Sequence, residues 1–371
     1  MDVREEFVRL ALSPGANRRE LCRRFGVSAP TASTWLRRYR AAGRDGLGDR
    51  SRRPRRSPAR TAEETEALVL AVRRESQGAW GGRKIRRRLE RLGQAPVPSA
   101  STSTEILRRH GELDAAESAK HAPFQRFEHP HPNALWQMDF KGHFPIAGGR
   151  CHPFPVLDDH SRYSLGLEAC PDERSRTVEG RLGAIFRRYG LPAAMPMDNG
   201  SPWGDGGDQP FTRLTVGPAR LGIRVAHARP YHPQTIGKDE RFHRTLKAEV
   251  LQGPRFPDLD ACQRAFSCWR HRYNHERPHE ALALAVPADR YRPSAIPFPE
   301  TLPPIEYGAS DIVRKVQQRG CISFRNREFR VGKAFVGEPV APRASAEDGV
   351  FGVYFCPQPI ARISLREAVH E

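Results

Sequence analysis

Three acidic residues stand where a folded core would favour another residue type. Asp139 lies in the apolar run LWQMDF, Asp198 ends the run AMPMD, and Glu240 lies in a helical pattern after HPQTIG. A carboxylate in an apolar strand is costly to bury unless a cation accompanies it. Mg²⁺ or Mn²⁺ takes carboxylate oxygens, and two such ions about 3.5–4 Å apart serve both reacting oxygens of a phosphoryl displacement. We therefore expect Asp139, Asp198 and Glu240 to hold two ions and to act in phosphodiester chemistry.

Each of these acids also has a plainer interpretation. Asp198 is followed by Asn199 and Gly200, a pair typical of a turn that ends a strand. Glu240 taken alone would be a solvent-exposed helix residue. Asp239 precedes it and lies about 100° around the helix, so both acids cannot face one pair of ions. We choose Glu240 as the ligand and expect Asp239 to face solvent or DNA.

Basic and imidazole side chains follow Glu240 at helical spacing, three, four and seven residues further on. Because such residues share one helix face, they could hold the scissile or flanking phosphates. They are His243, Arg244 and Lys247. Three further candidates for DNA contact are His232, Lys238 and Arg241. A solvated helix face is the alternative for the last three.

The cysteines do not form a recognisable metal or disulfide framework. The chain has 7 Cys and no C-x-x-C pair, so we expect buried thiols rather than disulfides. A zinc site from Cys262, Cys268, His271 and His275 is the alternative, but helical phase separates Cys262 from the others. Without an apolar run of about 18 residues we expect no membrane span. With no signal peptide either, we expect a cytoplasmic, nucleoid-associated protein.

The charge balance points to nucleic acid. Lys and Arg number 61 against 43 Asp and Glu, which gives a net charge of +18. Residues 1–60 alone hold 16 Arg and 6 acids, so the excess is concentrated near the N-terminus. A clustered basic excess is typical of a domain that binds a polyanion, and we expect double-stranded DNA as the partner.

Residues 18–42 have the turn and capping signals of a helix-turn-helix. The tight turn is at Gly26 and Val27, and Ser28 caps the second helix. We expect a small core from Leu21, Phe25, Val27 and Trp35. The side chains left to enter a major groove are Thr31, Thr34, Arg37 and Arg38. A helical hairpin with a solvated basic face is the alternative.

Composition shifts divide the chain into candidate domains. Residues 1–50 form the helix-turn-helix domain, 51–60 a basic linker, and 61–112 a second helical unit of helix-turn-helix or winged type. We expect capping boxes at Thr61 with Glu64 and at Thr102 with Glu105. The second unit has a basic face that could contact DNA, although a helical spacer is the alternative. This face contains Arg83, Lys84, Arg86, Arg87 and Arg88.

The remaining chain changes from helices to alternating strands and helices. After a linker over 113–132, residues 133–292 predict a mixed α/β domain, in which 135–146 and 153–170 supply three strands and 204–219 a Gly-rich loop. A Pro-rich linker covers 293–304. Residues 305–371 alternate apolar and polar side chains, which predicts a small antiparallel barrel or meander.

Five motifs in order resemble one family. WQMDF, DDHSRY, MDNGSPW, HPQTIGKDERFHRTLKAE and YNHERPHEAL are similar to the catalytic core of bacterial insertion-sequence transposases of the retroviral-integrase (DDE) superfamily. The resemblance covers about 133–290 and implies an RNase H-like core. It makes Asp139, Asp198 and Glu240 the first, second and third catalytic acids, and it places Asp158 and Asp159 in a structural role away from the metals. The 41 residues between Asp198 and Glu240 exceed the usual family spacing, and the Gly-rich segment can absorb the surplus.

The resemblance implies a transposase that binds the terminal inverted repeats of its element. Such an enzyme cuts DNA by water attack and joins the freed 3′-hydroxyl to target DNA. Two ends must be held together, so we expect a homo-oligomer, a dimer or a tetramer. A catalytically silent DNA-binding regulator and a metal-dependent nuclease on the same fold are the alternatives. The three intact acids argue against the first, and the two upstream DNA-binding units argue against the second.

Overall fold

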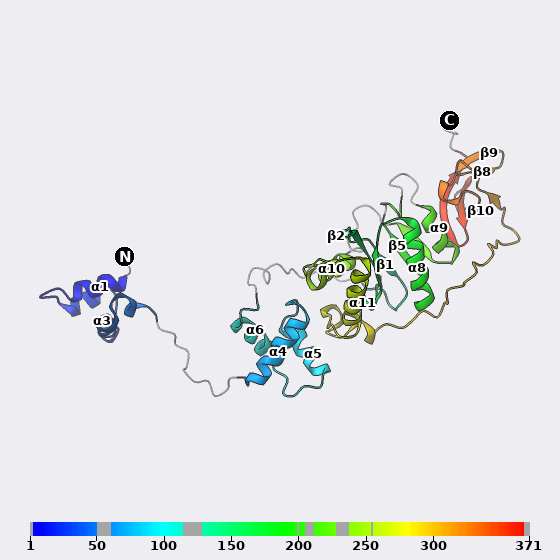
Figure 1. Cartoon of the computed structure of the whole chain (residues 1–371). Helices are drawn as coiled ribbons and strands as arrows, with labels where there is room; N and C mark the ends of the chain where they lie inside the picture. The colour runs from blue at the N-terminus through cyan, green and yellow to red at the C-terminus, as the bar shows by residue number, and fades with distance from the viewer. Residues whose placement is uncertain are drawn as a thin grey trace. The chain divides into compact units, whose positions relative to one another are not determined.

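The computed structural model describes residues 3–49, 61–113, 128–198, 200–204, 211–227, 237–253 and 255–366. The chain forms two compact units, Met1–Thr61 and Ala62–Glu371, which are described separately (Figure 1). No helix in the described ranges is long and apolar enough to cross a membrane.

The N-terminal unit is a three-helix domain. Its elements are α1 (Val3–Ala11), α2 (Arg18–Arg24), α3 (Ala29–Ala42) and a 3-10 turn (Gly43–Leu47). The Ser28 hydroxyl accepts from the Thr31 backbone N–H at 3.3 Å, as a helix N-cap should. Gly26 has a φ of +63°, which lets the chain turn between α2 and α3 without a Cβ clash.

The core of this unit is centred on α1, which the expected core did not include. Phe7 is fully buried, and its ring meets Phe25 and Trp35 edge-on at centroid distances of 5.6 and 5.7 Å. Leu21 and Val27 are only partly buried against this cluster. The expected core was therefore wrong in its centre, because α2 and α3 alone do not enclose a volume and need α1 to cover them.

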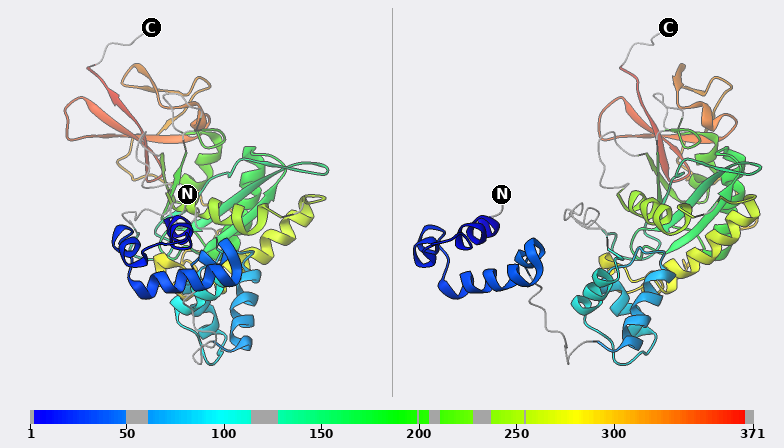
Figure 2. Two further views of the ribbon diagram at one scale, coloured as in Figure 1. Left: turned by 90° about the vertical axis from the view of Figure 1, so that its left-hand side faces the viewer. Right: turned by 60° about the vertical axis from the view of Figure 1, so that its left-hand side comes forward.

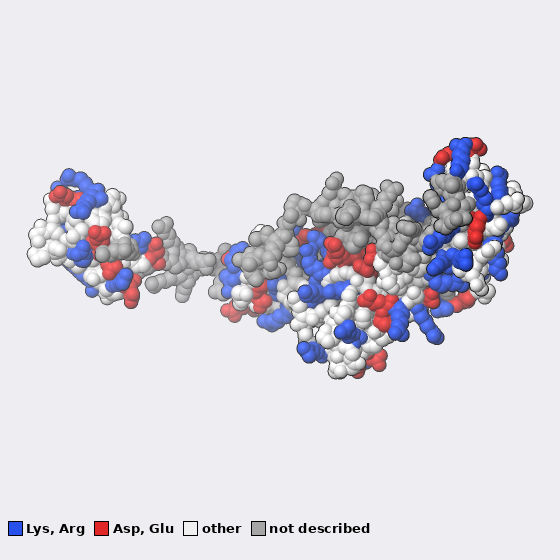
Figure 3. Space-filling model, turned by 90° about the horizontal axis from the view of Figure 1, so that it is seen from above, with Lys and Arg blue, Asp and Glu red and all other residues white. Residues whose placement is uncertain are grey.

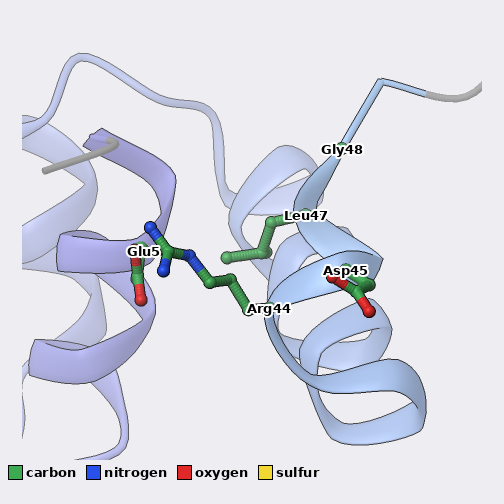
Figure 4. A pocket seen from close by; sticks show the side chains of 5 residues that line it. All are labelled: Glu5, Arg44, Asp45, Leu47 and Gly48. Carbon is green, nitrogen blue, oxygen red and sulfur yellow. Dashed lines mark ion pairs between the residues drawn. The ribbon is translucent and has the colours of Figure 1, made fainter.

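A shallow pocket lies where the 3-10 turn meets α1 (Figure 4). Arg44 reaches across it to Glu5, with 3.2 Å between Nε and Oε2, and Leu47 fills its floor. The Arg44 side chain is 76% exposed, so this ion pair contributes little stability. The burial of Leu47 is what attaches the turn to the domain.

Three helices open the second unit, and they pack into a small core of their own. They are α4 (Glu63–Glu75), α5 (Gly82–Arg91) and α6 (Ala100–Arg109). Gly82 permits the close approach of α5 and α6, because a Cβ there would lie 2.3 Å from the Ala100 carbonyl oxygen. Both expected capping boxes were wrong. The N-cap of α4 is Ala62 without a side-chain bond, and α6 is capped by Ser99, whose Oγ accepts from the Thr102 N–H at 3.0 Å.

The α/β core contains an antiparallel sheet built around one long strand. Its members are β1 (Trp136–Met138), β2 (Phe144–Ile146), β3 (Gly149–Asp158) and β4 (Ser164–Cys170). β1 and β2 both pair with β3, opposite its end and its beginning, and β4 pairs with β3 as well. The two segments expected to supply three strands therefore supply four, because the first segment breaks into β1 and β2 after Met138.

Two further strands and four helices complete the core. The parallel strands are β5 (Ala194–Met197) and β6 (Arg224–His227), and β5 contacts β1. The helices are α8 (Ser175–Tyr189), α9 (Arg213–Arg220), α10 (Gly237–Leu246) and α11 (Leu259–His275). A π-helical turn, Lys247–Leu251, continues α10.

The sheet is covered on both faces. Side chains of α8 and α9 share one apolar cluster with β1, β3 and β5, and those of α10 and α11 form a second cluster with the opposite face of β3 and β4. Figure 2 shows α11, in yellow, lying along the sheet. The expectation of a loop over 204–219 was wrong for its second half. Burial of Leu214, Val216 and Ala219 stabilises α9 even though Gly217 and Pro218 lie inside the helix.

The C-terminal region is an antiparallel sheet domain. Its strands are β7 (Arg314–Lys315), β8 (Cys321–Phe324), β9 (Arg327–Arg330), β10 (Pro339–Ala344), β11 (Val350–Phe355) and β12 (Gln358–Ser364). The order β12-β11-β10-β7 is open, and β8 and β9 form a separate hairpin, so the described strands close no barrel. Phe335 contacts Phe211 before α9 at 5.4 Å and joins this domain to the core.

Candidate active site

The structure places Asp139 and Asp198 close together. Asp139 follows β1 directly, Asp198 follows β5, and these two strands are neighbours. Burial, together with the Asp198 carboxylate, raises the pKa of Asp139 to about 6, although a hydrogen bond from the Phe140 backbone opposes the shift. Asp198 itself is exposed. Two neighbouring carboxylates, of which Asp198 raises the proton affinity of Asp139, are a suitable oxygen donor set for a hard divalent cation.

A fourth acid, Glu173, lies near this pair and also raises the pKa of Asp139. Its Oε1 lies 2.8 Å from Nδ1 of His152. Glu173 could not be identified from the sequence, because it lies in the polar stretch PDER, where a solvated loop is the ordinary interpretation. Only the contact of the β4–α8 connection with His152 on β3 reveals its position.

The helix α10 has a buried face that differs from the expected one. Asp239 is only 4% exposed, whereas Glu240 is exposed. The expectation that Asp239 faces solvent or DNA was therefore wrong. Phe242 and Leu246, three and seven residues after Asp239, are buried against α11, and helical phase carries Asp239 inward with them.

Asp239 is a buried acid beside the site. Burial raises its pKa well above the ordinary value, and the carboxylates of Asp139 and Asp159 act in the same direction. Its Oδ1 has no hydrogen-bond partner among the described residues. Within the same ranges no three His, Cys, Asp or Glu side chains are arranged to hold a metal ion. Glu240 as the third ligand thus stays a prediction.

His243 contacts the first acid rather than acting as a surface cation. It is partly buried and makes a hydrogen bond to the backbone of Asp139. Burial and the neighbouring Lys141 lower the pKa of His243 to about 4, so its imidazole is neutral at pH 7. Lys141 was not among the expected site residues. Burial and the proximity of Lys247 lower the pKa of Lys141, so these two lysines lie on one side of the site.

The expected DNA contacts on α10 separate into two groups. Arg241, Arg244 and Lys247 are exposed and remain candidates. Lys238 instead makes an ion pair with Asp159, and its side chain is only 15% exposed. His232 lies outside the described residues.

The basic face of α5 also has partners within the protein. Arg83 pairs with Glu280 at 3.0 Å, and Arg88 pairs with Glu276 at 2.6 Å. Burial and nearby Arg277 lower the pKa of Lys84 to about 8. Arg88 thus lies against the core, whereas the Arg83 side chain is 68% exposed and its DNA contact stays a prediction.

Arg87, the other expected DNA contact on α5, pairs with Glu90 of the same helix at 3.1 Å. Its side chain is 43% exposed. A DNA contact by Arg87 therefore stays a prediction.

Two of the side chains that α3 was expected to present to DNA form hydrogen bonds within the helix. The Thr31 hydroxyl bonds with that of Ser28 at 2.8 Å, and the Thr34 hydroxyl donates to the Pro30 carbonyl at 2.9 Å. Arg37 is exposed and Arg38 is half-buried. The arginines are therefore better placed than the threonines to reach a base edge.

Exposed basic side chains also gather on the C-terminal sheet domain, where none was expected as a contact (Figure 3). They are Arg314, Lys315, Arg319, Arg325, Arg327, Arg330 and Lys333. Their spacing in the sequence did not indicate that they form a basic cluster. The hairpin β8–β9 and its turn bring three of them, Arg325, Arg327 and Arg330, into one short segment.

Family models match most of the chain. Residues 311–370 match "IS481 family transposase, C-terminal domain", and residues 129–233 and 221–287 match two models described as "Integrase core domain". Residues 3–55 match "Helix-turn-helix domain" and residues 31–107 match "Homeodomain-like domain".

Two kinds of curated relative are similar to the core. The Gag-Pol polyprotein of baboon endogenous virus (strain M7) is 27% identical over 194 residues, which are 50% of this chain and 11% of the polyprotein. The insertion element IS476 uncharacterized 39.2 kDa protein of Xanthomonas euvesicatoria is 28% identical over 176 residues, 45% of this chain and 49% of that protein. The chain thus spans about a tenth of the first relative and about half of the second.

Solved structures of retroviral proteins also match this chain. A simian T-cell lymphotropic virus intasome, in complex with PP2A regulatory subunit B56 gamma, matches with a TM-score of 0.40 and 16% identity. That match covers 77% of this chain and 91% of the other. The HTLV-2 integrase catalytic core domain in complex with magnesium (trimeric form) matches with a TM-score of 0.34 and 15% identity, covering 44% and 99% of the two chains.

Proposed function

We propose that this chain, a member of the insertion-sequence transposases with a retroviral-type integrase core, cuts and joins DNA at the ends of its own mobile element. It would hydrolyse a phosphodiester at each end. The freed 3′-hydroxyl would then attack a phosphodiester of the target DNA, forming a new bond to that phosphorus and displacing the target's own 3′-oxygen. The observation that carries the proposal is the pairing of Asp139 with Asp198 beside the helix that carries Glu240.

Asp139, Asp198 and Glu240 would hold two Mg²⁺ or Mn²⁺ ions. When bound, such ions supply a deprotonated nucleophile at neutral pH and neutralise the charge that develops on the phosphate. The effect of the Asp198 carboxylate on the proton affinity of Asp139 supports this assignment, because a site that favours protonation of Asp139 also favours a divalent cation at the same oxygens. The neutral His243 would keep the backbone of Asp139 in place through its hydrogen bond to it.

Three parts of the chain would contact DNA. Arg37 and Arg38 of α3 would supply base contacts at the element end, since an arginine can bond two acceptors of guanine in the major groove. Arg241 and Arg244 of α10, and Lys247 at the start of the π-helical turn, would hold phosphates near the scissile bond. The exposed basic residues of the C-terminal sheet domain would add contacts that do not depend on sequence.

Strand joining requires that two element ends meet one target, so the active assembly would be a homo-oligomer on DNA, a dimer or a tetramer. Size-exclusion light scattering with and without end DNA measures this directly. A protein that remains a monomer on two-end DNA under conditions of strand joining would contradict the oligomer.

A supercoiled plasmid that carries the element ends tests the activity. With Mg²⁺ or Mn²⁺ we expect strand cuts at the ends and joined products, and with Ca²⁺ we expect DNA binding without turnover. A nuclease would give cuts without joined products, and a regulator would give binding alone. Undiminished cleavage in excess chelator would contradict the metal mechanism.

A further inference from the structure

One buried carboxylate joins the elements that carry the proposed catalytic acids. The Asp159 side chain is 2% exposed. It accepts from Nε2 of Gln137 at 2.6 Å, from the backbone N–H of His129 at 3.0 Å and from Nζ of Lys238. Both of its oxygens therefore have donors, and each donor comes from a different segment of the chain.

Two of these donors lie close in sequence to proposed metal ligands. Gln137 belongs to β1 and precedes Asp139 by two residues. Lys238 lies in the first turn of α10 and precedes Glu240 by two residues. Asp159, at the end of β3, thus connects the strand of the first acid to the start of the helix of the third.

The charges in this connection are suited to holding α10 in one place. Burial lowers the pKa of Lys238, while its hydrogen bond to Asp159 raises it. Arg162 lies beside Asp159 as a second cation, and its Nη2 is 3.8 Å from Glu128. A buried ion pair contributes little net stability, but breaking it by removing one partner is costly. Such a pair therefore holds a geometry more than it strengthens the fold.

We propose that Asp159 and Lys238 are positioning residues for Glu240. Their ion pair holds the start of α10 against β1, so that the exposed Glu240 carboxylate stays within reach of Asp139 and Asp198. This inference rests on the proposed function. It also replaces the expectation that Lys238 contacts DNA, because its ammonium group is directed into the protein.

Glu240 needs this support because it lies on a different kind of element from the other two acids. Asp139 and Asp198 follow neighbouring strands, which fix them through the sheet. Glu240 lies on the helix α10. The start of this helix is held to the sheet by the ion pair between Lys238 and Asp159. Groups that orient metal ligands from behind typically change metal affinity or activity by about 10–100-fold when removed, and we expect a loss of that size here.

Lys238→Met and Lys238→Arg test the proposal, with Asp159→Asn as a second route to the same loss. Met keeps the length of the chain without the charge, and Arg restores the charge. The control is Glu300→Gln, which removes an exposed ion pair to Arg187 on α8, far along the chain from the site. Each variant is measured for DNA affinity, for cleavage against Mg²⁺ concentration, for direct Mn²⁺ binding by calorimetry and for amide hydrogen exchange over α10.

For Lys238→Met and Asp159→Asn we expect cleavage to fall about 10–100-fold, the Mn²⁺ affinity to fall in parallel, and exchange over α10 to speed up. DNA affinity should stay close to that of the wild type, and Lys238→Arg should restore most of the activity. Glu300→Gln should match the wild type in every measurement.

Two results would overturn the inference. An equal loss of DNA affinity and cleavage in Lys238→Met would make Lys238 a phosphate contact. Unchanged Mn²⁺ affinity and α10 exchange would make the pair a structural anchor without effect on Glu240. Should Asp159→Asn fail to fold, the two Lys238 variants decide alone. If the wild-type protein cut no end DNA with any divalent metal, the proposed function would be rejected instead. The hydrogen-exchange measurement distinguishes the two failures, because it does not depend on DNA cleavage.

Discussion

Glu249 connects the second helical unit to the core, and its replacement by Gln should destabilise the chain strongly. Its side chain is almost fully buried and accepts three hydrogen bonds. They come from Nε1 of Trp80 at 3.2 Å, from Nε1 of Trp269 at 2.8 Å and from Nε of Arg277 at 3.0 Å. Trp80 follows α4, whereas Trp269 lies on α11, so one carboxylate is shared by both cores.

The magnitude follows from what Gln cannot do. It has the volume of Glu but only one acceptor oxygen, so its NH₂ group must face at least one N–H donor. Arg277, whose side chain is 10% exposed, also loses its counter-ion. Removing one partner of a buried ion pair costs about 3–5 kcal/mol, and we expect the free energy of unfolding to fall by that amount.

Denaturant unfolding followed by tryptophan fluorescence measures this loss, and Trp80 and Trp269 report on the contact itself. Glu347→Gln is the matched control, because its pair with Arg362 is 60–68% exposed and should change stability by less than about 0.5 kcal/mol. A loss below about 1 kcal/mol in Glu249→Gln, well under the cost of an unpaired buried charge, would refute the reasoning that this carboxylate holds the two parts together.

Three further changes follow. Lys84→Met should stabilise the fold by at most about 3 kcal/mol at pH 7 without loss of DNA affinity. The lowered pKa of Lys84 makes wild-type stability rise between pH 8 and 10.5, so the advantage of Lys84→Met should shrink over that range. Weaker DNA binding by Lys84→Met would contradict the assignment of Lys84 to the protein interior. Asp239→Asn should stabilise the fold at pH 8 and lose this advantage toward pH 4, because the raised pKa penalises ionisation; a pH-independent difference in denaturant unfolding would speak against it. Arg37→Ala with Arg38→Ala should lower the ratio of specific to non-specific DNA binding by about 1–3 kcal/mol per base contact, and an equal fall in both affinities would make them phosphate contacts.

The order of strands and helices in the core followed from local patterns. The runs ending at Asp139 and Asp198 have the apolar character of buried strands, and the structure places both acids at strand ends. The cap at Ser28 could likewise be predicted, because the turn and the capping residue are adjacent in sequence.

Helix phase was harder to predict. On α10 the sequence offers acids at both 239 and 240, and only the contact of Phe242 with Trp269 and Tyr273 decides which one turns inward. That contact depends on α11, which no local pattern places. The helix α9 was missed for a related reason, since Gly217 and Pro218 lower helix propensity and tertiary burial overrides them.

The basic face of α5 shows a limit of charge as a signal. A run of arginines predicts a polyanion, but it does not distinguish phosphates from carboxylates of the same protein. Arg83 and Arg88 pair with Glu280 and Glu276, which lie 197 and 188 residues away in the chain. Only the fold brings these acids to the helix.

The most direct test of the account is the cutting and joining of end DNA by Glu240→Gln and Asp239→Asn, side by side with the wild type in Mg²⁺. Glu240→Gln keeps shape and removes the charge, so folding and DNA binding should persist while both steps fall by several orders of magnitude. Asp239→Asn should cut and join at close to the wild-type rate. An active Glu240→Gln beside an inactive Asp239→Asn would show that the third ligand is the buried Asp239, whose pKa the Asp139 carboxylate raises.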